Sequence, residues 1–291
     1  MLEFKKIALG DRTTITAAAR QNPLPQLIDC FEAFFLWRDL LDVAWAEWDD
    51  FLVFRTNYDG TPAFLFPWGS GDPTAVIGQM QEYAATQKKP FRISKATRAQ
   101  ARRLDALFPG RFRAMYDPNR FEYLYSAEKF RYYRGDPFKA KRNFVNYAKK
   151  NLSWAYEEIT PANLPECLDF ARDFSGDDTF EVDNGALMEL HDTFFELQTE
   201  GGLIRIEGRV AAFFVVTSLG DPKIAAGLFL RGDHGSKGVI PLLYQEFFLH
   251  HPEFERVNLA EDLGLEGLRR NKQSYHPDEM LELCEITLAD D

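Results

Sequence analysis

The order of apolar segments along the chain constrains its fold most. Short strand-like runs alternate with amphipathic helical stretches, first over residues 24–125 and again over residues 140–288. This mixed order is typical of α+β units, in which helices cover the faces of a sheet. A chain of 291 residues is long for one hydrophobic core and ample for two. We therefore predict two α+β units, residues 1–137 and 138–291, with the turn-forming segment 134–137 between them.

Apolar periodicity and the Pro and Gly positions predict the individual elements. In the first half, helices are expected over 24–43, 74–86 and 98–107, and strands over 50–56, 62–66, 91–93 and 121–125. In the second half, helices are expected over 140–151, 164–174, 186–200, 239–250 and 265–271. The strands of that half are expected over 155–159, 201–208, 209–219, 223–230, 256–259 and 280–288, with a hairpin turn near Gly208.

Charge and composition exclude several classes of protein. The formal net charge of −11 argues against general nucleic-acid binding, because phosphate contacts need concentrated Lys and Arg. The three cysteines lie far apart without a CxxC pair, which suits a reducing compartment. The N-terminus lacks the apolar region of a signal peptide, and no apolar run approaches the ~20 residues of a membrane span. A cytoplasmic protein is expected.

Two common catalytic centres find no support in the sequence. A GxSxG elbow of serine hydrolases is absent. The five histidines never form an i, i+4 pair with a nearby Glu, so we expect surface histidines and no metal site.

The segment 228–239 is the first candidate site. A strand ends there, and Arg231, Gly235, Lys237 and Gly238 precede an apolar helix. Free backbone amides at a helix start, with two added cations, suit a phosphate or another anion. The alternative is a glycine-rich turn that only joins strand to helix.

The second candidate is the segment 257–277. It carries Asn258 at a strand end, Glu261 and Asp262 before a helix, and Arg269, Lys272 and Tyr275 towards its end and beyond. One interpretation is a site in which Tyr275 donates a proton and Lys272 or Arg269 binds phosphate. The other is that acids at the helix start and bases at its end simply suit the helix dipole.

The third candidate is the basic helix over 138–151. Lys139, Arg142 and Asn146 share one helical face, and Asn143 lies beside them in a KRNxxN pattern. Either this is a solvated basic face or it forms a rim that meets an anionic substrate or cofactor.

Taken together, these stretches resemble the C-terminal domain family of phosphatidylglycerol lysyltransferases. The matching strings are FFLWR at 34–38, FLFPWG at 64–69, FKAKRNFVN at 138–146 and the segment 258–277, which ends in KQSYHP. They cover both halves, over about residues 25–290. The KRNxxN and DLGLEGLRxxKxSYxP patterns are specific in combination.

This resemblance implies a bacterial protein with two tandem GNAT-like (acyl-CoA N-acyltransferase) domains, each a mixed central sheet flanked by helices, related to the Fem peptidyltransferases. The second domain would carry the active cleft and transfer an acyl group from acyl-CoA or aminoacyl-tRNA to an amine or hydroxyl, without a metal. The loop 231–238 departs from the usual CoA-binding pattern, and we expect no counterpart of the membrane-embedded half of the lysyltransferases within these 291 residues. Contact with anionic lipid stays open.

The resemblance also suggests roles for the candidate residues. The expected catalytic residues are Tyr275, Glu261 and Asp262. Those expected to bind the donor's phosphates are Arg231, Gly235, Lys237, Gly238 and Lys272. Those expected to bind substrate are Arg142, Asn143, Asn146, Asn258 and Arg269. The alternative is a catalytically inactive GNAT-like module that binds an anionic or nucleotide-like ligand.

Overall fold

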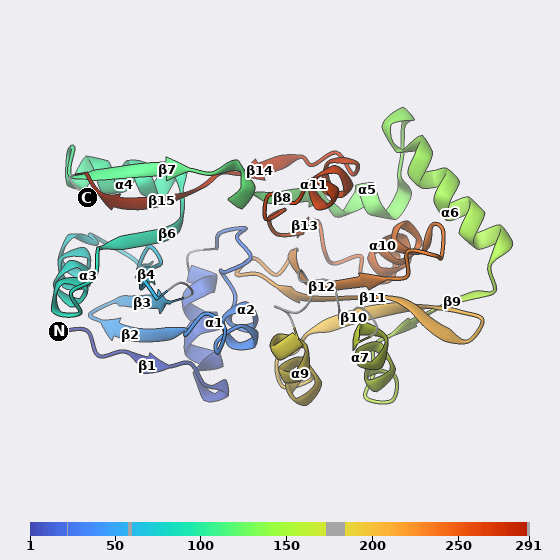
Figure 1. Cartoon of the computed structure of the whole chain (residues 1–291), viewed down its shortest axis with the longest axis horizontal. Helices are drawn as coiled ribbons and strands as arrows, with labels where there is room; N and C mark the ends of the chain where they lie inside the picture. The colour runs from blue at the N-terminus through green and yellow to red at the C-terminus, as the bar shows by residue number, and fades with distance from the viewer. Residues whose placement is uncertain (22, 58–59, 173–183, 290–291) are drawn as a thin grey trace.

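A computed structural model describes residues 1–21, 23–57, 60–172 and 184–289 and shows two mixed β-sheets side by side, flanked by helices (Figure 1). The α+β class is therefore confirmed. Within the described residues, no helix is both long and apolar enough to span a bilayer.

The first sheet has the strand order β1-β2-β3-β4-β6-β15-β7, and β5 pairs with β3. Its strands are β1 (Lys5–Lys6), β2 (Ala44–Trp48), β3 (Phe51–Thr56), β4 (Ala63–Phe64), β5 (Trp68–Gly69), β6 (Arg92–Thr97), β7 (Phe112–Tyr116) and β15 (Leu283–Leu288). The helices of this half are α1 (Arg12–Gln21), α2 (Phe31–Leu36), α3 (Thr74–Thr86) and α4 (Arg98–Leu107). The predicted helices over 74–86 and 98–107 are confirmed.

The second sheet has the order β14-β8-β13-β12-β11-β10-β9. Its strands are β8 (Glu122–Ser126), β9 (Trp154–Glu158), β10 (Glu200–Ile206), β11 (Arg209–Ser218), β12 (Ile224–Gly232), β13 (Arg256–Asn258) and β14 (Glu279–Leu281). Helices α5 (Ala127–Tyr132), α6 (Lys139–Asn151) and α10 (Val239–His250) pack together on one face. Helices α7 (Leu164–Arg172) and α9 (Asn184–Thr193) lie on the other (Figure 1), and α11 (Glu266–Gln273) follows β13.

The chain passes between the two sheets more than once. Strand β8 belongs to the second sheet, although it lies in the first half of the sequence. The segment predicted as one strand over 280–288 divides at Glu282, so that β14 pairs with β8 and β15 pairs with β6 and β7. The division after residue 137 stays a prediction; the sheets themselves exchange strands across it.

One hydrophobic cluster joins the two halves. It contains Trp45 and Phe54 of the first sheet together with Phe213 and Phe229 of the second. The ring of Trp37, just after α2, stacks on Phe229 with centroids 5.1 Å apart. Burial of this shared apolar surface holds the sheets against each other.

Two predicted helices are shorter than expected. The helix over 24–43 was wrong in extent, because only Phe31–Leu36 is helical. Residues 26–29 form a turn in which the Asp29 amide donates to the Gln26 carbonyl at 3.0 Å, and both side chains are buried. The helix over 186–200 ends at Thr193, since Glu200 already starts β10.

The predicted hairpin over 201–219 is confirmed. Glu207 and Gly208 form its two-residue turn with φ of 50° and 80°, which is the left-handed pair of a type I′ turn.

Candidate functional site

Strands β12 and β13 diverge at their carboxyl ends. They pair in parallel over only three residue pairs, from Ile224↔Arg256 to Ala226↔Asn258. Strand β12 then continues along β11 to Gly232, whereas the chain after β13 stays beside β8, where the Tyr123 amide donates to the Ala260 carbonyl at 3.1 Å. Ligands of mixed α/β sheets bind where neighbouring strands part at their carboxyl ends.

Polar side chains from both sheets meet beside this divergence. We call Asp29, Lys95, Glu122, Asn258 and Glu261 the junction cluster. They come from the turn before α2, from β6, β8 and β13, and from the loop after β13. Asp29, Glu122 and Asn258 are buried, and Lys95 and Glu261 are partly exposed.

Glu122 lies at the centre of the junction cluster. Its Oε2 accepts hydrogen bonds from the Leu27 amide at 2.9 Å and from Asn258 Nδ2 at 2.7 Å. Its Oε1 lies 3.4 Å from Lys95 Nζ, which also lies 3.0 Å from Glu261 Oε2. A buried carboxylate is tolerated only with such partners, so the cluster fixes the two sheets in one relative position.

The backbone is strained at one cluster residue and beside another. Lys95 has φ of 52°, and Ala260, which lies next to Glu261, has φ of 60°; both are in the left-handed region that residues with a Cβ rarely occupy. The Gln26 side chain holds the first by donating to the Lys95 carbonyl at 3.1 Å. Non-glycine residues in this region tend to gather at functional sites.

Asp29 is the most perturbed acid of the cluster. Burial, followed by the nearby Glu122 charge, raises the pKa of the Asp29 carboxyl well above its usual range. Its Oδ2 is buried without a hydrogen-bond partner. Burial and a like charge both disfavour the ionised form of a carboxyl, so Asp29 differs in chemistry from an ordinary surface acid.

The predicted residues of α11 and the loop before it are paired with one another. Arg269 contacts both oxygens of Asp262, at 2.7 and 2.9 Å, and this guanidinium lowers the pKa of Asp262 to about 2. The Tyr123 hydroxyl donates to the same carboxylate at 2.6 Å. The Asp262 carboxylate is therefore engaged by Arg269 and Tyr123 in a structural ion pair.

Lys272 is turned inward. Its ammonium donates to the carbonyls of Leu259 and Glu261, the second at 2.7 Å, and burial lowers the pKa of Lys272 to about 8. Its predicted contact with phosphate stays a prediction, and in this structure the ammonium orders the loop after β13.

In the predicted anion loop, the side chain of Asp233 bonds to the turn itself. The Gly235 amide donates to Asp233 Oδ1 at 2.8 Å, and the Ser236 hydroxyl donates to Oδ2 at 2.6 Å. The Ser236 and Gly235 hydrogen bonds lower the pKa of Asp233, so a negative charge already occupies the turn. Gly238, with φ of 88°, packs against the Phe144 backbone. Arg231 is buried at the end of β12.

Tyr275 follows α11 and lies in a buried cluster that contains several aromatic rings. It is 2% exposed, and its ring centroid is 5.3 Å from that of Phe130 and 5.5 Å from that of Tyr244. Lys141 Nζ lies 3.5 Å from the centre of the Tyr275 ring, and burial lowers the pKa of Lys141 to about 8. Packed rings thus surround Tyr275, and its role as a proton donor stays a prediction.

Helix α6 carries both polar and aromatic side chains on its exposed surface, whereas Arg142 bonds to the backbone before the helix. Arg142 donates to the carbonyls of Tyr133 and Gly135, whereas Asn143 and Asn146 are exposed. Phe144 and Tyr147 are also exposed, and the ammonium of Lys237 lies 5.0 Å from the centre of the Tyr147 ring.

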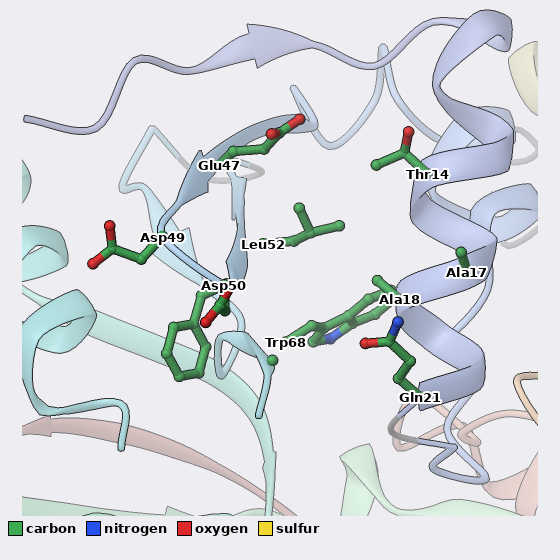
Figure 2. Close-up of a pocket in the computed structure, with 11 residues that line it drawn as sticks. Thr14, Ala17, Ala18, Gln21, Glu47, Asp49, Asp50, Leu52 and Trp68 are labelled. Carbon is green, nitrogen blue, oxygen red and sulfur yellow. The ribbon is translucent and has the colours of Figure 1, made fainter. Parts of the chain in front are cut away.

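A cavity of about 320 Å³ lies away from the junction cluster, between α1 and strands β2, β3 and β5 (Figure 2). Leu52 and Trp68 project towards α1 across it, and the Asp49 carboxylate points away from α1. Its acidic lining residues Glu47, Asp49 and Asp50 are all exposed to water. The buried, perturbed groups of the junction cluster make it the stronger candidate site.

Sequence reasoning found Asn258 and Glu261 of the junction cluster and missed the other three. Lys95 and Glu122 are charged residues within strands whose neighbours are largely buried, and this is the one signal that could have marked them. Asp29 lay inside a segment interpreted as helix.

Comparisons with known proteins agree with this architecture. The family model described as "Phosphatidylglycerol lysyltransferase, C-terminal" matches residues 23–283. A search of curated proteins found no match. A protein of unknown function from Bacteroides thetaiotaomicron has a similar crystal structure, with 29% identity, a TM-score of 0.94 and coverage of 99% of this chain and 100% of that one.

Two more distant structures share the fold. The L-PGS structure from Bacillus licheniformis has 13% identity and a TM-score of 0.66, and the match covers 90% of this chain and 93% of that one. A tandem GNAT protein from the clavulanic acid biosynthesis pathway has 13% identity and a TM-score of 0.54, and the match covers 99% of each chain. The expected tandem GNAT-like fold is thus confirmed.

Proposed function

Since the chain belongs to the family of phosphatidylglycerol lysyltransferase C-terminal domains, we propose that it is an aminoacyltransferase. In this proposal it takes an aminoacyl group from aminoacyl-tRNA and delivers it to a hydroxyl or amine at the junction cluster. The observation that carries the proposal is the partly exposed Glu261, held by Lys95 at 3.0 Å where β12 and β13 part. A general base must be reachable by the acceptor, and the Glu261 side chain is 13% exposed.

The proposed reaction is an ester or amide exchange. The acceptor oxygen or nitrogen attacks the carbonyl carbon of the aminoacyl ester and forms a new bond, and the bond to the ribose oxygen breaks. Glu261 takes the proton from the acceptor and returns it to the departing ribose oxygen. No atom or electron is left over, and most of the rate gain comes from holding the two substrates together.

The neighbours of Glu261 act as positioning residues. Lys95 and Arg120 hold its two oxygens, at 3.0 and 3.4 Å. Lys272 holds its backbone carbonyl. Asp262, also predicted as catalytic, has no exposed side-chain surface, so an acceptor has no access to its carboxylate. We therefore assign the base role to Glu261 alone.

Aminoacyl-tRNA is favoured over acyl-CoA as donor by the charge of the loop after β12. A pyrophosphate placed on the amides of this loop would meet the Asp233 carboxylate, which occupies the Gly235 amide at 2.8 Å. The exposed face of α6 instead offers rings and cations together, with Tyr147 beside Lys237. Aromatic rings with adjacent cations suit unpaired nucleotides at the end of an RNA.

The test compares donors on the full chain. We expect label from lysyl-tRNA, or from another aminoacyl-tRNA in a mixed pool, to move to phosphatidylglycerol vesicles or to a small amine. Turnover with acetyl-CoA and no transfer from any aminoacyl-tRNA would overturn the donor assignment. Thermal stabilisation by these ligands without turnover on any acceptor would instead support an inactive binding module.

A further inference from the structure

Side chains that commonly bind metal converge at the end of α10. Nδ1 of His251 lies 2.9 Å from Glu200 Oε2 and 3.0 Å from Glu253 Oε1. One ligand atom from each of these three residues lies within 4.8 Å of the other two. They come from β10, from the end of α10 and from the loop that follows, none of which carries the junction cluster.

The second imidazole nitrogen of His251 contacts a different carboxylate. His251 Nε2 lies 3.1 Å from Glu158 Oε2 at the end of β9. A histidine that ligates a metal through one nitrogen commonly donates its other N–H to a carboxylate, which fixes the ring and its tautomer. Glu158 is held in turn by the Tyr156 hydroxyl at 2.8 Å.

The cluster carries excess negative charge. Three carboxylates surround a single imidazole, so even a protonated ring leaves a charge of −2. Among the described residues, no Lys or Arg forms an ion pair with Glu158, Glu200 or Glu253. Most other acidic side chains that form ion pairs in the described residues pair with Lys or Arg, as Glu157 does with Arg205. A divalent cation would supply the missing charge.

We propose that His251, Glu200 and Glu253 bind a Zn²⁺ ion, with Glu158 orienting the imidazole. One nitrogen and two carboxylate oxygens are ligands that zinc accepts, and a water would complete four-coordination. The imidazole favours zinc over Mg²⁺ and Ca²⁺, which prefer oxygen ligands alone. The ion would tie the end of α10 to the edge of the sheet formed by β9 and β10, as a structural link.

The experiment titrates Zn²⁺ into the chelator-treated full chain by calorimetry, with thermal unfolding measured in parallel. We expect one ion per chain, a Kd of micromolar or below and a higher Tm. His251→Ala and Glu253→Gln should weaken binding at least about tenfold and remove the Tm increase, and Glu158→Gln should weaken it less. Co²⁺ should give the intense visible absorption of a four-coordinate site, and His251→Ala should remove it.

His191→Ala is the matched control, because His191 is an exposed histidine whose ion-pair partner, within the described residues, is the adjacent Asp192 at 2.7 Å. It should bind zinc as the wild type does. Circular dichroism of each variant checks that it folds. Absence of saturable binding by the folded wild type, or unchanged binding by folded His251→Ala, would overturn the proposal. Because the ligands lie outside the junction cluster, Glu261→Gln should not change zinc affinity, which separates this proposal from the transferase.

Discussion

The buried Glu122 carboxylate depends on hydrogen-bonding and charged partners from other parts of the chain. Glu122 has no exposed side-chain surface, and Lys95, the Leu27 amide and Asn258 satisfy its oxygens. These partners lie far away in sequence, so no spacing rule could bring them together. Asn258 and Glu261 were predictable because they sit in one short segment with strand and helix signals around them.

Glu122→Gln should lower the free energy of unfolding by about 1.5–3 kcal/mol, because the buried carboxylate that accepts hydrogen bonds from the Leu27 amide and Asn258 is replaced by a neutral amide. The new amide would also present N–H groups to donors. Urea denaturation measures the loss. The control Glu128→Gln removes an exposed partner of Arg134 and should cost less than about 1 kcal/mol. Equal losses in the two variants would contradict the central role of Glu122.

Lys272 should make stability rise with pH. Burial lowers its pKa from the usual 10.5 to about 8, so the unfolded chain binds more protons between these values. The cost of burying the charge is therefore full below pH 8 and is relieved as pH rises towards 10.5. Between pH 7.5 and 9.5 the gain should be about 2 kcal/mol.

Urea denaturation at both pH values, with wild type and Lys272→Met compared, isolates this contribution. The increase in the free energy of unfolding between the two pH values should be about 2 kcal/mol smaller in Lys272→Met than in the wild type. The same pH dependence in both proteins would show that the Lys272 ammonium is not desolvated.

Elements with strong local signals were predictable. Helices α3, α4 and α10 and the hairpin of β10 and β11 have regular apolar spacing and clear end signals, and the structure confirms them. The segment 24–43 has helical apolar spacing as well, yet tertiary contacts of Gln26 and Leu27 hold its first part in a turn. The split of 280–288 between two sheets depends on partners elsewhere, which one strand's pattern cannot reveal.

The packing of α6 against the start of α10 should not tolerate a side chain at Gly238. A Cβ at Gly238 would overlap the Phe144 carbonyl, and φ there is 88°. Gly208 has a similar φ of 80° and open space around it. Gly238→Ala should therefore cost about 2–5 kcal/mol, the sum of backbone strain and overpacking. Gly208→Ala should cost only the strain of about 1–2 kcal/mol. Thermal and urea unfolding compare them, and similar losses would contradict the packing argument.

The whole molecule is two GNAT-like sheets joined by exchanged strands, a shared apolar cluster and the junction cluster. The catalytic proposal places Glu261 at that joint, where both halves supply its neighbours. The residues predicted for the site all come from the second half, whereas Asp29, Lys95 and Glu122 of the junction cluster come from the first. Tyr275 sits among packed rings, which favours a structural role for its side chain.

Single-turnover transfer from aminoacyl-tRNA tests the central claim most directly. Glu261→Gln should slow the chemical step at least about 100-fold, the usual contribution of a general base. Glu266→Gln, an exposed neighbour on α11, and Tyr275→Phe should stay within a few-fold of wild type. Full activity in folded Glu261→Gln, or a loss confined to Tyr275→Phe, would contradict the account.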